Sequence, residues 1–127
     1  MVYVLLGTGF EETEAIAPVD LLRRAGVKVT TVGINGKIVK GSHGIGVEAD
    51  TTLEKTDFSD LEMIVLPGGL GGVASCRASK GAMDALEQAI YDKTLDAKDF
   101  ADCQVVKDTY TLLVRKKSGK NKEKENP

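Results

Sequence analysis

The stretch that most constrains the fold is a short apolar run that stops abruptly in a glycine turn. Met63 to Leu66 are four apolar residues in a row, and Pro67-Gly68-Gly69 follows them directly. Such a run is typical of a parallel strand buried on both faces. An open α/β sheet binds its ligand where such strands end. We therefore expect this turn to form the floor of a site, because its backbone N–H groups can approach a bound group closely. The alternative is that Pro-Gly-Gly only terminates the strand.

The first 32 residues predict a strand, a helix and a second strand. Val2 to Leu6 is an apolar run, and residues 15–26 carry apolar side chains at helical spacing, with acids before them and arginines near the end. Residues 27–32 are rich in β-branched side chains. Because the joints are short, this pattern predicts a right-handed βαβ unit with parallel strands. Pro18 is expected to kink the helix or to mark an irregular first turn.

The later pattern predicts smaller elements. We expect a hairpin turn at Asn35-Gly36, an edge strand over residues 46–50 and a polar connector over residues 53–61 with one helical turn. A helix is expected over residues 79–93 with Ser79 as its cap. Two strands of a hairpin are expected at residues 103–107 and 110–114.

The charge of the chain is unevenly distributed. The 127 residues carry a net charge of −2, and 42% of them are hydrophobic, which suits one domain with one core. Residues 115–127 hold six basic residues against two acidic ones, a net +4, which leaves −6 for the remaining 114 residues. We expect a domain over residues 1–114 and a basic disordered tail over residues 115–127. The acidic domain argues against nucleic-acid binding, and a nucleic-acid arm in the tail is the alternative to a solvated end.

The cysteines and the single histidine argue against a structural zinc site. Cys76, Cys103 and His43 have no metal-ligand spacing. No G-x-G-x-x-G, P-loop or H-E-x-x-H is present, which argues against dinucleotide, nucleotide and zinc-protease chemistry. No leader or membrane span is recognisable, so we expect a cytoplasmic protein with free thiols and no membrane partner.

Three carboxylates follow the first strand. Glu11, Glu12 and Glu14 stand between this strand and the helix, which is the crevice position of a parallel sheet. Acids at this position commonly do no more than stabilise the N-terminus of the helix. Because the helical pattern begins directly after Glu14, we expect its side chain to turn inward toward Gly68-Gly69. Desolvation there would raise the pKa of the carboxyl and let it relay a proton.

The other reactive side chains each have two interpretations. Cys76 precedes the expected helix, where a thiolate is favoured, but a lone cysteine is commonly an inert small hydrophobe. Cys103 follows Asp102, whose carboxylate opposes thiolate formation. His43 is either a loop residue or part of the site lining.

Three segments together carry a resemblance to a known family. They are V-Y-V-L-L-G-T-G-F-E-E-T-E-A-I-A-P-V-D-L-L-R-R-A-G-V-K-V-T at residues 2–30, G-S-H-G-I-G-V-E-A-D at residues 41–50 and I-V-L-P-G-G-L-G-G at residues 64–72. This combination resembles the DJ-1/ThiJ/PfpI family, specifically its DJ-1 and YajL-like branch. The resemblance extends over residues 1–95.

The resemblance implies a fold and an activity. The implied fold is a flavodoxin-like α/β sandwich with a mostly parallel central sheet, and the implied assembly is a homodimer. The implied activities are cofactor-independent glyoxalase, protein deglycase and oxidant-sensing activity, with 2-oxoaldehydes or glycated proteins as partners. In such a site a protonated glutamate stabilises a cysteine thiolate on a strand-to-helix elbow. Glu14 matches that glutamate and Gly69 the glycine whose N–H points into the site. Arg24 matches an arginine near the site or the dimer interface, and His43 a position where some members have a basic residue. We expect Gly68, Arg24 and His43 to bind the substrate.

The sequence departs from the family after residue 93. The resemblance implies an apolar strand that enters an A-I-C-A-x-P elbow, whereas here Thr94-Leu95 gives way to Asp96-Ala97-Lys98-Asp99. Residues 100–108 resemble a later family stretch instead, which favours an internal deletion, alternative splicing or a divergent gene model. We therefore expect an incomplete C-terminal part and an impaired activity. Whether Cys76 or Cys103 replaces the missing nucleophile stays open.

Two other functions are compatible with the sequence. One is a non-catalytic interaction or oligomerisation module with a DJ-1-like fold, because an incomplete sheet exposes apolar faces and an unpaired edge. The other is a flavodoxin-like ligand binder that uses the Gly7 to Gly9 turn for a phosphate.

Overall fold

Five strands form the central sheet of the computed structural model, which describes residues 1–89 and 112–115. Their order is β5 (Thr51–Thr52), β2 (Val29–Gly33), β1 (Val2–Leu6), β6 (Met63–Leu66) and β7 (Leu112–Arg115). β1 pairs in parallel with both β2 and β6, and β2 pairs in parallel with β5, whereas β7 runs antiparallel to β6. The mostly parallel sheet predicted from the sequence is confirmed.

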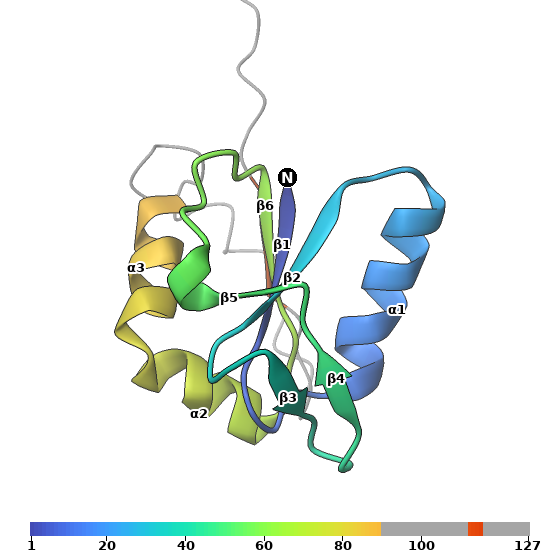
Figure 1. Cartoon of the computed structure of the whole chain (residues 1–127), viewed down its shortest axis with the longest axis vertical. Coiled ribbons are helices and arrows are strands. Elements are labelled where there is room, and N and C mark those ends of the chain that lie inside the picture. Colours follow the sequence, from blue (N-terminus) through green and yellow to red (C-terminus); the bar gives the residue numbers. More distant parts are fainter. Residues whose placement is uncertain (90–111, 116–127) are drawn as a thin grey trace, which may run out of the picture.

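Helices cover both faces of this sheet (Figure 1). α1 (Glu12–Arg24) lies on one face, and the short 3₁₀ turn η1 (Leu53–Lys55), α2 (Leu70–Ala78) and α3 (Lys80–Ala89) lie on the other. Successive side chains of a strand point to opposite faces, and β1 therefore supplies two cores. Val2, Val4 and Leu6 pack into the core beneath α1, whereas Tyr3 and Leu5 pack into the core beneath α2 and α3.

Local sequence signals set both ends of α1. The Glu11 side chain accepts a hydrogen bond from the Glu14 N–H at 2.8 Å, which caps the first turn. At the other end Gly26 adopts a φ of +78°, and the Val27 N–H donates to the Leu22 carbonyl at 2.9 Å. This is a Schellman motif, in which a left-handed glycine closes the helix. The helix contains Pro18 within its span, and the parallel βαβ unit is as expected.

A second, two-stranded sheet lies beside the first helix. β3 (Ile38–Lys40) pairs antiparallel with β4 (Gly46–Glu48), and the loop over residues 41–45 joins them. The prediction of a hairpin turn at Asn35-Gly36 is wrong, because β2 and β3 flank this dipeptide but belong to different sheets. The two-residue strand β5 was not predicted, since its pairing with β2 depends on tertiary contacts rather than on a local pattern.

The segment after the glycine turn is a helix rather than a loop. α2 begins at Leu70, although glycines at 71 and 72 lower its intrinsic helix propensity. A Cβ on Gly72 would lie only 2.8 Å from the Cα of Phe10, so close packing against the loop after β1 requires a residue without a side chain. The next helix, α3, starts as predicted: the Ala82 N–H donates to the Ser79 hydroxyl at 3.2 Å.

The C-terminal part completes one edge of the sheet. β7 coincides with most of the second expected strand, and it pairs with β6 instead of with a hairpin partner among the described residues. The expected strand over residues 103–107 and nearly all of the expected basic tail lie outside the described residues. Among the helices that the structure describes, none has the length and apolar character needed to cross a bilayer.

Candidate functional site

The carboxyl ends of β1 and β6 lie side by side, and the turns that follow them meet. The Glu11 N–H donates to the Gly68 carbonyl at 2.9 Å. The Gly68 N–H in turn donates to Oε2 of Glu14 at 2.6 Å. The start of α1 therefore binds both the carbonyl and the N–H of Gly68. Gly68 is buried and Glu14 is half-buried. This is the crevice at the end of parallel strands where the sequence predicted the site.

Glu14 turns toward the Gly68-Gly69 turn, as expected from the sequence. The bond to its carboxylate comes from the N–H of Gly68, whereas Gly69 is the glycine whose N–H the family resemblance directs into the site. Gly69 has a backbone role here: its φ is +94°, and a Cβ on it would lie 2.5 Å from the carbonyl oxygen of Gly9 and 2.9 Å from the Glu11 nitrogen. Any side chain at Gly69 would push the turn away from α1.

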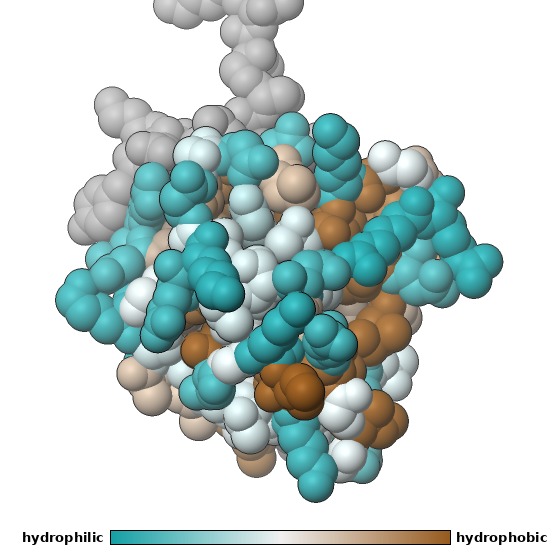
Figure 2. Space-filling view, viewed as in Figure 1, coloured by the Kyte–Doolittle hydropathy of each residue, from teal (hydrophilic) through white to brown (hydrophobic). Residues whose placement is uncertain are grey.

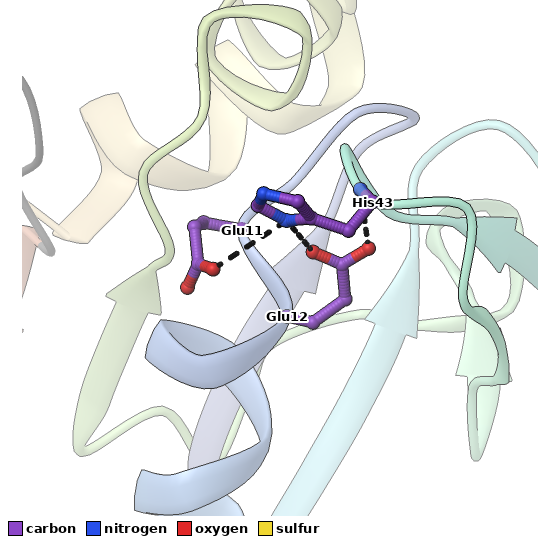
Figure 3. A group of neighbouring side chains, drawn as sticks. All are labelled: Glu11, Glu12 and His43. Atoms are coloured by element: carbon purple, nitrogen blue, oxygen red, sulfur yellow. Dashed lines mark hydrogen bonds and ion pairs between the residues drawn. The ribbon is translucent and has the colours of Figure 1, made fainter.

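Glu12 is the most strongly bound carboxylate of this region, and sequence reasoning gave it no separate role. Its side chain is 8% exposed, and its Oε1 accepts the backbone N–H of His43 at 2.7 Å (Figure 3). Its Oε2 lies 2.9 Å from Nδ1 of the same histidine. Burial opposes ionisation of Glu12, but the hydrogen bonds from His43 and Ile45 outweigh it and lower the pKa to about 2. The sequence feature that could have predicted this contact is the turn from Gly41 to Gly44. Its conformation lets the loop pack against the Glu12 carboxylate.

His43 lies against Glu12, near the start of α1. Its side chain is 72% exposed, and the hydrogen bond to Glu12 and the nearby charge of Glu11 raise its pKa. Oε1 of Glu11 lies 3.8 Å from Nδ1. His43 comes from the loop between β3 and β4, and both glutamates come from the start of α1. The contact therefore fastens the small hairpin sheet to the end of β1.

Arg24 does not join this site within one chain. It ends α1, ten residues beyond Glu14, which corresponds to about 15 Å along a helix axis. Its side chain is 75% exposed, and its Nε donates to Asp20 one turn earlier at 2.9 Å. Its neighbour Arg23 is the better-fixed residue, because it bonds both the Val29 carbonyl at 3.1 Å and Asp50 at 2.5 Å.

Cys76 occupies an apolar environment. It lies in the last turn of α2, four residues before the start of α3, and burial raises the pKa of its thiol. Together with Leu5, Leu66 and Leu86 it lines a pocket of about 310 Å³ on the α2 and α3 side of the sheet. An apolar environment opposes the thiolate, which agrees with the inert interpretation of Cys76. Cys103 lies outside the described residues.

The Gly7 to Gly9 turn does not present a phosphate cradle. The Gly9 N–H donates to the Lys40 carbonyl at 2.8 Å, and the Phe10 N–H donates to the Gly7 carbonyl at 3.0 Å. The Thr8 N–H donates to Oδ1 of Asn35 at 3.2 Å. These three amide groups are occupied by the protein itself, so the flavodoxin-like phosphate site has no support from the geometry.

Known proteins share this arrangement of strands and loops. The model of the DJ-1/PfpI family matches residues 1–110. The chain is 47% identical over 70 residues to protein dj-1beta of Drosophila melanogaster, covering 54% of this chain and 37% of that protein. It is 36% identical over 86 residues to the Parkinson disease protein 7 homolog of Danio rerio, covering 66% of this chain and 46% of that protein.

The structural comparison agrees with the sequence comparison. The crystal structure of Drosophila melanogaster DJ-1beta superposes with a TM-score of 0.69 at 39% identity, covering 72% of this chain and 50% of that one. The chain thus spans half or less of the length of these relatives. Because the family model covers most of its length, the chain belongs to the DJ-1/PfpI family.

Proposed function

We propose that this chain is a DJ-1-like protein whose site takes 2-oxoaldehydes or the adducts that they form on proteins, with turnover impaired in the chain as it stands. The observation that carries the proposal is the 2.6 Å hydrogen bond between Glu14 and the Gly68 N–H, which fixes a carboxyl at the end of β6. The matching glutamate in the family motif and the membership of the family support the same assignment. No cofactor is part of this proposal.

The proposed chemistry is an internal redox isomerisation followed by hydrolysis. A thiolate attacks the aldehyde carbon of methylglyoxal and gives a hemithioacetal. Glu14 carries the proton from the former aldehyde carbon to the neighbouring carbon, which leaves a thioester, and water releases lactate and the thiol. A backbone N–H of the glycine turn, that of Gly69, stabilises the oxyanion. His43 and Gly68 lie beside the substrate in this scheme.

The impairment follows from the position of the thiols. Cys76, the one cysteine among the described residues, is buried in the apolar pocket and its thiol has a raised pKa. The thiol must therefore come from Cys103 or from a second molecule. In this proposal the chain supplies the carboxyl and the turn, and residues 1–89 and 112–115 hold no activated nucleophile next to them.

Methylglyoxal turnover, with and without a small added thiol such as 2-mercaptoethanol, tests the proposal. We expect kcat/KM below about 10⁴ M⁻¹s⁻¹, the lower end of the usual enzyme range, and an increase in lactate formation when the thiol is added. Glu14→Gln should reduce the thiol-dependent rate by about 10²-fold or more, since proton transfer contributes that much. Glu54→Gln, at an exposed carboxyl on η1, is the matched control.

Two results would contradict this assignment. Turnover without added thiol in the ordinary enzyme range would remove the proposed impairment. A thiol-dependent rate that Glu14→Gln leaves at the level of Glu54→Gln would remove Glu14 from the mechanism.

A second function, a non-catalytic module that associates with itself as a homodimer, is favoured by exposed apolar side chains. Leu21 on α1 is 66% exposed, and Ile38 and Ile45 around the β3–β4 hairpin are 77% and 56% exposed. Figure 2 shows hydrophobic surface in the region of this hairpin and on the side of α1. A role for Arg24 at the site would also need a second copy. Light scattering that reports a stable monomer at high protein concentration would count against this function.

We also propose a cytoplasmic location for the chain. Cys76 is a free thiol in the structure, and free thiols are typical of a reducing compartment. Detection of the tagged protein in a cytosolic fraction tests this.

A further inference from the structure

Glu11, Glu12 and His43 form a group of three ligand-type side chains, and the proposed turnover uses neither of the two carboxylates. One atom from each, two carboxylate oxygens and Nδ1 of the histidine, lie within 4.8 Å of one another (Figure 3). Two of the ligands are carboxylates and the third is an imidazole, a donor set that suits first-row transition metals better than Ca²⁺ or Mg²⁺. We propose that these three residues bind a divalent transition-metal ion, with Zn²⁺ as the ion to test.

The distances between the donor atoms suit a small ion. Zinc binds nitrogen and oxygen at about 2.0–2.1 Å, so two donors of a tetrahedral site lie about 3.3 Å apart. Here Nδ1 of His43 is 2.9 Å from Oε2 of Glu12 and 3.8 Å from Oε1 of Glu11. These two separations lie on either side of the tetrahedral value, and the donor oxygens of Glu11 and Glu12 lie within 4.8 Å of each other. Side-chain adjustment would therefore bring the three atoms to bonding distance.

Backbone hydrogen bonds already orient both carboxylates. Oε2 of Glu11 accepts the Glu14 N–H at 2.8 Å, which leaves its Oε1 directed toward the histidine. Oε1 of Glu12 accepts the His43 N–H at 2.7 Å, which directs its Oε2 to Nδ1. Each carboxylate thus accepts a backbone N–H at one oxygen and directs the other toward His43, although Oε2 of Glu12 also accepts the Ser42 hydroxyl at 3.3 Å. Such outer hydrogen bonds hold ligands in place and improve metal affinity.

The surroundings of the three side chains allow an ion to enter. The Glu12 side chain is 8% exposed and that of Glu11 20%, whereas His43 is 72% exposed on the outside of the loop. An ion would therefore have protein ligands on the inner side and water on the outer side. Two carboxylates neutralise its charge. The site differs from a closed structural zinc site, which has four protein ligands, and we expect weaker binding than in such a site.

The simplest competing interpretation is an ion pair between Glu12 and His43 with no metal. In that case a proton occupies the space between Nδ1 and Oε2. Metal binding replaces this proton with the ion and recruits Glu11, whereas the ion pair leaves Glu11 3.8 Å away. The two interpretations therefore predict different behaviour of the histidine ring when Zn²⁺ is added.

The test uses the full chain and ¹⁵N NMR of its single histidine, during titration with Zn²⁺ at mildly alkaline pH and with the thiols blocked by alkylation under denaturing conditions before refolding. We expect saturable binding at one equivalent, with a large shift of the Nδ1 resonance and a proton retained on Nε2. Saturable binding that leaves both ring nitrogens unchanged, or the absence of binding up to millimolar Zn²⁺, would overturn the proposal. A shift at Nε2 in place of Nδ1 would overturn it as well.

Variants locate the site among the carboxylates. Isothermal titration calorimetry should show at least tenfold weaker Zn²⁺ binding for His43→Gln and for Glu11→Gln. Loss of a residue that only orients a metal ligand already weakens binding by about that factor. Glu54→Gln, on η1, should bind as the unchanged chain does. Because Glu11→Gln keeps an oxygen for the helix cap, its fold should survive, and equal affinity of Glu11→Gln and the unchanged chain would overturn the three-ligand site. The readout is binding alone, so its outcome is separate from that of the methylglyoxal assay.

Discussion

The glycine turn between β6 and α2 separates two regions of opposite character. On the α1 side, Glu11, Glu12 and Glu14 each accept at least one backbone N–H, and the Glu12 carboxyl is ionised down to about pH 2. On the other side, Cys76 lies among apolar side chains in a pocket of about 310 Å³, and its thiol has a raised pKa. One region stabilises charge through fixed amide groups, and the other opposes it through burial.

The comparison bears on the impairment that we propose for this chain. A cysteine-dependent reaction needs its thiolate and its carboxyl in one environment. Among the described residues, the carboxyls are gathered in the polar region and the thiol lies in the apolar one. The chain therefore retains the scaffold that orients Glu14 while its described thiol is held neutral elsewhere.

The largest expected effect comes from Gly69, which lets the two regions meet. Gly69→Ala introduces a Cβ 2.5 Å from the Gly9 carbonyl oxygen at a φ of +94°, and we expect it to lower the free energy of unfolding by about 3 kcal/mol or more. Urea denaturation followed by circular dichroism measures this. Gly46→Ala, where a Cβ meets nothing within 4 Å, is the control. Equal midpoints for the two variants would mean that the turn does not need close contact.

Substitutions of Cys76 that differ in polarity test the apolar region. Cys76→Ser places a hydroxyl in the pocket and should lower the free energy of unfolding by about 1–3 kcal/mol, because a buried hydroxyl without a partner is costly. Cys76→Ala removes the sulfur without adding a polar group and should cost less. Denaturant midpoints of both variants check the order. Alanine costing more than serine would show that the environment of Cys76 is polar, and the contrast between the two regions would fail.

The sequence predicted some elements of these two regions and missed others. The run from Val2 to Leu6, the helix stop at Gly26 and the strand before Pro67 are local signals, and each one placed its element correctly. The crevice followed from the rule for parallel strands, which needs only the order of the elements. α2 was missed because Gly71 and Gly72 have low helix propensity. Close packing of Gly72 against Phe10 requires a glycine there, and no local sequence pattern indicates this contact.

The details of the site depend on the folded chain for the same reason. The choice between Gly68 and Gly69 as the donor to Glu14 depends on the direction of one peptide group, and their sequence positions are equivalent. The pairing of Glu12 with His43 joins residues 31 positions apart through the β3–β4 loop. A sequence can nominate such residues by type, but only the folded loop decides which pair forms.

The pH dependence of stability tests the polar region, because the Glu12–His43 pair titrates. The folded pKa of Glu12 is lowered to about 2, so its contribution to stability is fully present above its ordinary 4.5 and is lost as the pH falls below that. The pKa of His43 is raised, so its contribution is fully present below its ordinary 6.5 and is lost as the pH rises through the folded value. The pair is therefore most stabilising between about pH 4.5 and 6.5.

Urea midpoints of the unchanged chain and of His43→Gln, measured across this range, check the prediction. The difference between the two should be largest between pH 4.5 and 6.5 and should shrink on both sides. Because the chain has one histidine, no other imidazole titrates. A difference that stays constant with pH would mean that the bond to Glu12 does not involve the charged ring.

The smallest expected effect on the free energy of unfolding concerns Arg24, the arginine matched to the family motif. Arg24 forms an exposed pair with Asp20 one turn earlier, and Arg24→Ala should change the free energy of unfolding by about 0.3–0.5 kcal/mol. Arg23 instead links α1 to the Val29 carbonyl and to Asp50, whose carboxylate also accepts the Thr31 N–H at 2.8 Å. Arg23→Ala should therefore cost more, up to about 1 kcal/mol after allowance for solvent screening, and denaturant midpoints resolve the difference. If Arg24→Ala proves the costlier change in a sample that light scattering shows to be dimeric, Arg24 has a partner in the second copy, and the polar region extends across the interface.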